Sequence, residues 1–157
     1  MISEKCYIDA LSQNGLKFGD NVSMGYATHI ELTGSLKLIG KGMTVGNNVG
    51  LGSYGHYGSG AGSLEIGDDT IFGNYVSIHP ENHITQNLNK PIREQGVYSK
   101  GGVKIERGCW IGAKVTILDG TEIGDGCIVA AGAVVTGVFP DYSIIGGVPA
   151  RVLNIRK

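Results

Sequence analysis

The sequence predicts an all-β fold in which the chain coils into a parallel β-solenoid. Two observations carry this prediction: a six-residue repeat along most of the chain, and 27 glycines with only four prolines among 157 residues. A six-residue period matches neither the 3.6-residue period of a helix nor the two-residue alternation of a single strand. It matches a short strand followed by a turn, repeated so that each coil stacks on the next. The glycines also lack the strict three-residue period of collagen.

The repeat has an aliphatic position that faces the interior of a narrow prism and, four residues later, a compact position at its corner. Gly follows many of the aliphatic residues, where we expect turns that need a positive φ. In chain order the aliphatic positions are Phe18, Met24, Ile30, Ile39, Val45, Leu51, Ile66, Phe72, Ile78, Ile84, Ile105, Ile111, Ile117, Ile123, Val129 and Val135. The compact positions of the last run are Cys109, Val115, Thr121, Cys127 and Ala133.

Three irregular spacings predict excursions from the prism, after Ile30, after Leu51 and after Ile84. The second contains "SYGHYGSGAGS" and is expected to be a hairpin or turn on the surface. The third predicts a long active-site loop around 85–102, because loops of more than about 12 to 15 residues in a compact domain are usually functional or disordered. Its mixed polar, aromatic and apolar content argues against disorder. Since Ile84 keeps the six-residue phase, we expect the prism to hold His83 at the root of this loop.

The overall composition limits the classes of function. The formal net charge of -1, with acidic and basic residues interleaved, gives no electrostatic footprint for nucleic acid or an anionic membrane. No apolar run reaches the roughly 20 residues of a membrane helix, and three cysteines without close pairing argue against a secreted disulfide framework. We therefore expect one domain over 1–157, a cytoplasmic location, small-molecule ligands, and neither nucleic acid nor membrane insertion.

The candidate catalytic side chains are His79 and His83, because the proton affinity of histidine suits general base catalysis near neutral pH. From the residues alone, either one is a general base or an ordinary surface histidine, and the position at the loop root favours His83. Cys6, Cys109 and Cys127 are poor nucleophile candidates, since the last two occupy compact core positions.

From about residue 66 to residue 151 the chain resembles the hexapeptide-repeat acetyltransferases of the galactoside, maltose and capsular-polysaccharide type. The resemblance lies in "IGDDTIFGNYVSIHPENH" and in "KPIREQGVYSKGGVKIERGCWIGAKVTILDGTEIGDG". It implies a left-handed parallel β-helix, a triangular prism with three hexapeptides per coil. It also implies transfer of an acetyl group from acetyl-CoA to a hydroxyl of a sugar or surface-polysaccharide precursor, without a metal, in a homotrimer with sites between subunits.

The resemblance also implies roles for single residues. His83 falls on the position of the catalytic histidine and would take the proton of the acceptor hydroxyl. The backbone N–H of Ala113 would stabilise the developing oxyanion, and Trp110 would line the pantetheine channel. Asn82 and Glu81 are expected to contact the acceptor. The other positions that match CoA contacts are Ala131, Thr136, Gly137 and Arg151.

Two positions depart from the galactoside-type pattern. Gly137 stands where those enzymes carry a Lys, and Asn154 stands where they carry a second Arg. Because cations bind the phosphates of CoA, these departures predict a weaker affinity for the nucleotide end or a different path for it.

Other readings stay open. The chain could be a non-catalytic β-helix subunit, or a carbonic-anhydrase-like enzyme that binds zinc or iron through three histidines. No regular placement is expected to bring three of the four histidines, His29, His56, His79 and His83, onto adjacent faces. An amine or an antibiotic hydroxyl is the alternative acceptor. The residues expected to face an acceptor are Tyr54, His56, Tyr57, Glu81 and Glu94.

Overall fold

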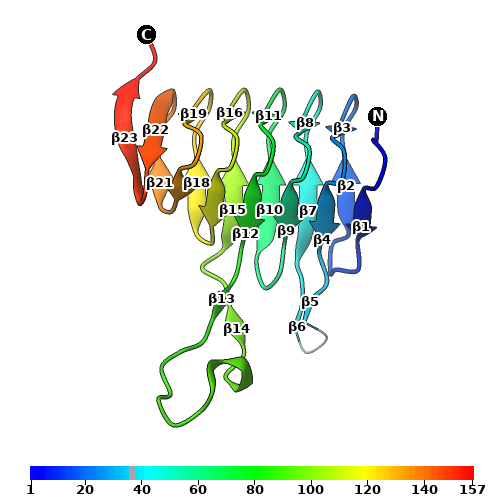
Figure 1. Cartoon of the computed structure of the whole chain (residues 1–157), viewed down its shortest axis with the longest axis vertical. Coiled ribbons are helices and arrows are strands. Elements are labelled where there is room, and N and C mark those ends of the chain that lie inside the picture. The colour runs from blue at the N-terminus through cyan, green and yellow to red at the C-terminus, as the bar shows by residue number, and fades with distance from the viewer. Residues whose placement is uncertain (36–37) are drawn as a thin grey trace.

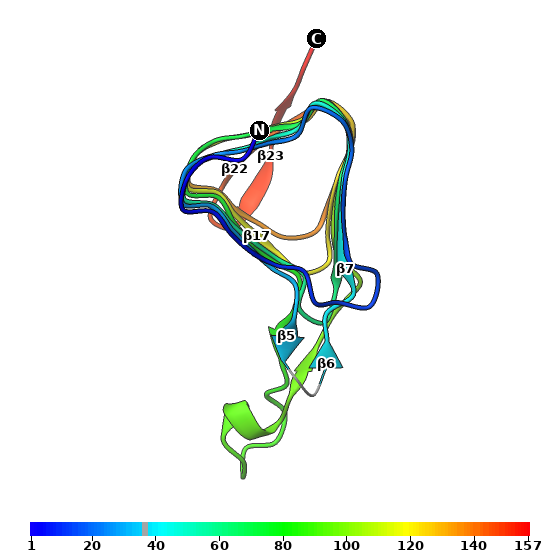
Figure 2. The same ribbon diagram turned by 90° about the vertical axis from the view of Figure 1, so that its right-hand side faces the viewer.

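The computed structural model describes residues 1–35 and 38–157 as a left-handed parallel β-helix with a triangular cross-section (Figures 1 and 2). Each coil contributes one short strand to each of three sheets, and the strands of successive coils pair in parallel. The prediction of an all-β, left-handed prism is confirmed. No helix among the described residues has the length and apolarity needed to cross a membrane.

The three sheets form the three sides of the prism, and the chain runs along the first, second and third side in every coil. The first side holds β1 (Tyr7–Asp9), β4 (His29–Glu31), β9 (His56–Gly58), β12 (Ser77–His79), β17 (Thr116–Leu118) and β20 (Val134–Val135). The second holds β2 (Leu16–Phe18), β7 (Gly42–Val45), β10 (Ser63–Ile66), β15 (Gly102–Ile105), β18 (Thr121–Ile123) and β21 (Val138–Phe139). The third holds β3 (Ser23–Met24), β8 (Gly50–Leu51), β11 (Ile71–Phe72), β16 (Trp110–Ile111), β19 (Ile128–Val129), β22 (Ser143–Gly147) and the antiparallel β23 (Ala150–Ile155).

The core follows the six-residue code. Ile78, Ile111 and Ile117 are fully buried, as are the compact residues Val115 and Cys127. Burying such side chains contributes about 1.5–3 kcal/mol each, so the repeat is the main source of stability. The expected positions that depart from full burial are Phe18, Ile39 and Ile84.

We expected the glycines after the aliphatic residues to adopt a positive φ. In the structure they instead allow close packing between successive coils. Gly73 and Gly112 are absent from the positions with positive φ. A Cβ atom on Gly73 would lie 2.6 Å from the nitrogen of Ala113, and one on Gly112 would lie 2.6 Å from the nitrogen of Ala131. The backbone of one coil therefore rests directly on the next. The positive φ falls two residues after the glycine, for example at Tyr75 and Lys114.

Two corners of the triangle carry most of the candidate site residues. The loop corner, between the first and second sides, comprises residues 32–35, 38–41, 59–62, 80–101, 119–120 and 136–137. From it project a hairpin of β5 (Gly34–Ser35) and β6 (Leu38–Ile39), and the long loop with β13 (Asn82–His83), η1 (Ile92–Glu94) and β14 (Val97–Tyr98) (Figure 2). The alanine corner, between the third and first sides, comprises residues 25–27, 52–54, 73–75, 112–114 and 130–132.

Two expectations about the excursions are wrong. The stretch "SYGHYGSGAGS" is part of a regular coil, because Tyr57 occupies an interior position of β9 and packs against Phe72 with ring centroids 5.5 Å apart. Relative to a regular coil, the only insertion in this stretch is a short turn at residues 59–62 between β9 and β10. Ile84 has left the prism and is half-buried within the loop, so the six-residue phase ends at Ile78 and the loop begins earlier than expected.

Candidate functional site

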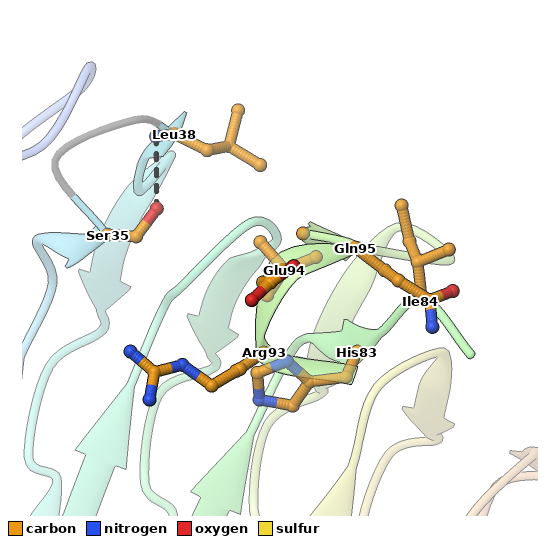
Figure 3. A pocket seen from close by; sticks show the side chains of 9 residues that line it. Ser35, Leu38, His83, Ile84, Arg93, Glu94 and Gln95 are labelled. Atoms are coloured by element: carbon orange, nitrogen blue, oxygen red, sulfur yellow. Dashed lines mark hydrogen bonds between the residues drawn. The ribbon is translucent and has the colours of Figure 1, made fainter. Parts of the chain in front are cut away.

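His83 lies in the stem of the long loop. The stem is a two-stranded antiparallel ladder in which His83 pairs with Val97 and Asn82 pairs with Tyr98. The imidazole is exposed and lines a hollow of about 740 Å³ between the long loop and the β5–β6 hairpin (Figure 3). The other residues that line this hollow are Ser35, Leu38, Ile84, Arg93, Glu94, Gln95, Gly96 and Val97.

A buried carboxylate fixes this stem to the prism. Asp119, which is 3% exposed, accepts hydrogen bonds from the side chains of Asn82 and Ser99, each at 2.7 Å. It also accepts from the backbone N–H groups of Lys100 at 2.6 Å and Gly102 at 3.0 Å. One side chain therefore holds both ends of the loop. The sequence reasoning missed Asp119, and the only signal was an acidic residue in "ILDG", where the coil turns at the loop corner.

Asp119→Ala is expected to loosen the loop, because loss of the acceptor leaves buried donors unsatisfied at a cost of about 1–3 kcal/mol. Hydrogen exchange of the loop amides should accelerate by about tenfold or more. Asp68→Ala is the matched control: Asp68 accepts from the N–H of Asn47 at 2.7 Å, at a different corner. Exchange in the loop that is equal in the two variants would contradict the anchoring role.

Glu81 and Asn82, the expected acceptor contacts, both serve the loop root. The Glu81 carboxylate accepts from the N–H of Ala61 at 2.9 Å in the preceding coil, and Asn82 donates to Asp119. Neither residue lines the hollow beside His83. Of the other residues expected to face an acceptor, Glu94 lines that hollow, Tyr57 is in the core, and Tyr54 lies at the alanine corner.

Three histidines of successive coils form a histidine column on the first side of the prism, which the sequence reasoning did not expect. The column is not in strict register, because His56 pairs with Ser77 and His79 lies two residues further along its strand. His29 pairs directly with His56, and the rings of His56 and His79 stack with centroids 5.4 Å apart. The β5–β6 hairpin is inserted between His29 and His56, so the spacing of these two histidines in the sequence is not that of a regular coil. Burial, followed by the neighbouring His56, lowers the pKa of His79, while Glu81 opposes the shift.

The histidine column gives the metal alternative no support. Across residues 1–35 and 38–157, no group of three His, Cys, Asp or Glu side chains is arranged to hold a metal ion. The cysteines match their expected structural role. Burial raises the pKa of the Cys109 thiol to about 12 and raises that of Cys127 as well, so neither supplies a thiolate nucleophile near neutral pH.

The alanine corner gathers three of the residues expected to contact CoA. Trp110, Ala113 and Ala131 line one hollow of about 490 Å³, together with Gly73, Asn74, Gly112 and residues 128–130. The indole of Trp110 is about half exposed there. The remaining candidates lie elsewhere: Thr136 and Gly137 are at the loop corner between β20 and β21, and Arg151 is in β23.

Along the alanine corner, a side-chain oxygen of one coil accepts a hydrogen bond from a backbone N–H of the preceding coil, and this series ends at the hollow. The N–H of Tyr26 donates to the hydroxyl of Ser53 at 3.1 Å, and the N–H of Ser53 donates to the side-chain oxygen of Asn74 at 3.0 Å. In the next coils the corresponding residues are Ala113 and Ala131, whose methyl groups accept nothing. Among the hydrogen bonds of the described residues, the N–H groups of Asn74 and Ala113 have no acceptor. The hollow thus holds backbone donors that are free to bind a ligand oxygen.

Comparison with known proteins identifies the repeat. The family description "Bacterial transferase hexapeptide (six repeats)" matches residues 102–137. A probable acetyltransferase of Mycobacterium tuberculosis is 42% identical over 60% of this chain and 31% of that protein. A protein of Escherichia coli K12 named as a lipopolysaccharide biosynthesis O-acetyl transferase, WbbJ, is 30% identical over 95% of this chain and 75% of that protein. The galactoside O-acetyltransferase of Lactococcus lactis is 35% identical over 68% of this chain and 53% of that protein.

Solved structures share the fold. The N-acyltransferase AntD from Bacillus cereus, in complex with dTDP and 3-hydroxybutyryl-CoA, has a TM-score of 0.80 and 23% identity over 99% of this chain and 79% of that chain. A hexapeptide-repeat acetyltransferase of Vibrio cholerae complexed with acetyl coenzyme A has a TM-score of 0.62 and 22% identity over 90% of this chain and 71% of that chain. With the near full-length match to the Escherichia coli protein, the repeat and the prism show that this chain belongs to the hexapeptide-repeat acetyltransferase family.

Proposed function

We propose that this protein transfers an acetyl group from acetyl-CoA to a hydroxyl of a sugar or of a surface-polysaccharide precursor. Two relatives that cover much of the chain are named as O-acetyltransferases, one for lipopolysaccharide biosynthesis and one for galactosides, and solved neighbours carry CoA thioesters. The observation that carries the proposal is the uncapped N–H of Ala113 in the hollow beside Trp110. An oxyanion-hole donor must be in place before the reaction and free of other partners.

The residues divide the chemistry between them. His83 would accept the proton of the acceptor hydroxyl as the oxygen attacks the thioester carbon. The N–H of Ala113 would donate to the carbonyl oxygen, which becomes negative in the tetrahedral intermediate. When the intermediate collapses, the C–S bond breaks, the protonated His83 would give its proton to the sulfur, and CoA leaves as the thiol. Trp110 and Ala131 would hold the pantetheine, and Arg151, an exposed cation in β23, would bind phosphate.

The two halves of this mechanism lie at different corners of one chain. The hollow beside His83 and the hollow at Ala113 share no residue. The chain takes six residue steps from Ala113 to Asp119 along the first side, from the alanine corner to the loop corner, a path of up to about 20 Å at 3.3 Å per step. A general base must lie within about 3 Å of the proton that it takes. We therefore propose a homotrimer in which the loop corner of one protomer meets the alanine corner of the next, a heterologous ring contact.

A cytoplasmic location is part of the proposal. The structure holds three unpaired cysteines, which fits a reducing compartment.

The direct test is release of the CoA thiol from acetyl-CoA in the presence of candidate acceptors. We expect release only when a hydroxylated sugar or sugar precursor is present, and an O-acetyl product in the mass spectrum. Binding of CoA without transfer to any of a broad set of sugars, amines and antibiotics would favour the non-catalytic alternative.

A further inference from the structure

The hollow beside His83 lies on the N-terminal side of the long loop. Its opposite wall is the β5–β6 hairpin of an earlier coil, which contributes Ser35 and Leu38 (Figure 1). The hollow at the alanine corner extends instead toward the C-terminal coils, as far as Ala131. A three-fold axis parallel to the prism keeps equal coils of neighbouring protomers at equal height. The thioester would thus reach His83 from the C-terminal side, which leaves the hollow to the acceptor.

The loop wall of this hollow is held in shape by its own hydrogen bonds. The side-chain amide of Gln95 donates to the carbonyls of Asn87 and Lys90, both at 2.8 Å, and its oxygen accepts from the N–H of Asn87 at 3.0 Å. These bonds fix the short helix η1, on which Arg93 lies. The position of the Arg93 backbone is therefore set by the loop and not by a ligand.

Among the described residues that line this hollow, Arg93 is the one with a permanent positive charge. Arg93 and His83 line the same hollow, and both come from its loop wall (Figure 3). The salt bridges of residues 1–35 and 38–157 are His29–Glu31, Lys104–Glu106 and Arg107–Asp125, so none involves Arg93. A guanidinium group binds one carboxylate or phosphate through two parallel hydrogen bonds. The apolar side chains of Leu38, Ile84 and Val97 on the same walls would strengthen such a bond by excluding water.

We propose that Arg93 binds an anionic group of the acceptor, a carboxylate or a phosphate, and so selects acidic sugars or sugar phosphates. The proposal rests on the proposed function and names the acceptor class for the same site. Glu94, the neighbouring acid on the wall, disfavours a second anionic group and leaves room for hydroxyls that donate to it. The bound anion would place a nearby hydroxyl of the sugar against His83.

The test compares three probes that differ only at carbon 6: methyl glucoside, methyl glucuronide and methyl glucoside 6-phosphate. Thiol release from acetyl-CoA gives kcat/KM for each, and calorimetry on the CoA-loaded protein gives the binding affinity without turnover. The variant is Arg93→Gln. Lys90→Gln is the matched control, because Lys90 is an exposed cation of the same loop that does not line the hollow.

We expect the wild type to prefer at least one anionic probe over the glucoside by about tenfold or more, as a bidentate charged pair allows. Arg93→Gln should abolish that preference, while Lys90→Gln should behave as the wild type. The comparison of the two anionic probes separates carboxylate from phosphate. Equal use of all three probes, or a preference that survives in Arg93→Gln, would overturn the proposal. If no probe is acetylated, the calorimetric affinities test the proposal on their own. Anionic probes that bind no better than the glucoside would refute the role of Arg93.

Discussion

Ala131→Ser is expected to lower the rate of acetyl transfer about 10²–10³-fold, the usual loss when one oxyanion-hole donor is removed. The new hydroxyl would occupy, three coils further along the same corner, the position equivalent to that of the Ser53 hydroxyl. There it would accept a hydrogen bond from the N–H of Ala113, as the Ser53 hydroxyl accepts one from the N–H of Tyr26 at 3.1 Å. The donor would then be occupied by the protein itself. Turnover and the melting temperature should be measured together, since the cap is expected to leave the fold intact or stabilise it.

The matched control for this variant is Ala113→Ser. Its hydroxyl would accept a hydrogen bond from the N–H of Asn74 in the preceding coil and leave the N–H of Ala113 free. Both variants add the same atom to the same hollow, so a steric effect would appear in both and a loss of the donor only in Ala131→Ser. Equal losses in the two variants would show that the N–H of Ala113 is not the oxyanion donor.

His83→Ala is expected to lower turnover by about 10²–10⁴-fold, the usual contribution of a general base. The affinity for CoA should be unchanged, because His83 does not line the hollow at the alanine corner. The assay is single-turnover acetyl transfer, combined with calorimetry of CoA binding. His79→Ala is the control, since His79 is a histidine on the first side of the prism and lies outside the hollow beside His83. A turnover in His83→Ala equal to that of the control would move the base elsewhere.

The sequence predicted the prism well because the fold repeats a local pattern. Ile111, Ile117 and Val129 recur at a fixed spacing, and each needs only its equivalent in the next coil to be buried. The same reasoning failed where an aromatic residue took an aliphatic place, at Tyr57. It also failed at Ile84, where an apolar residue kept the phase but packs within the loop. The six-residue spacing alone does not distinguish a residue inside the prism from an apolar loop residue that matches the spacing by chance.

The candidate site was predictable only in part, because its groups come from distant positions or from the backbone. Trp110, Ala113 and Ala131 come together, as the resemblance implied. Asp119 could not be identified, because its partners lie up to 37 residues away and meet it only after the loop is closed. The free N–H of Ala113 follows from the absence of a side-chain oxygen in the next coil, which becomes visible only when the register of the coils is known.

Complementation between two inactive variants tests directly whether each active site is shared between two protomers. Protomers of His83→Ala and Ala131→Ser are mixed, dissociated and reassembled, and acetyl transfer is assayed. If each site joins the loop corner of one protomer to the alanine corner of the next, random assembly makes about one site in four fully intact, so about a quarter of the wild-type activity should return. If activity stays at the level of the separate variants although mixed oligomers have formed, the site does not span two protomers and the composite mechanism is wrong.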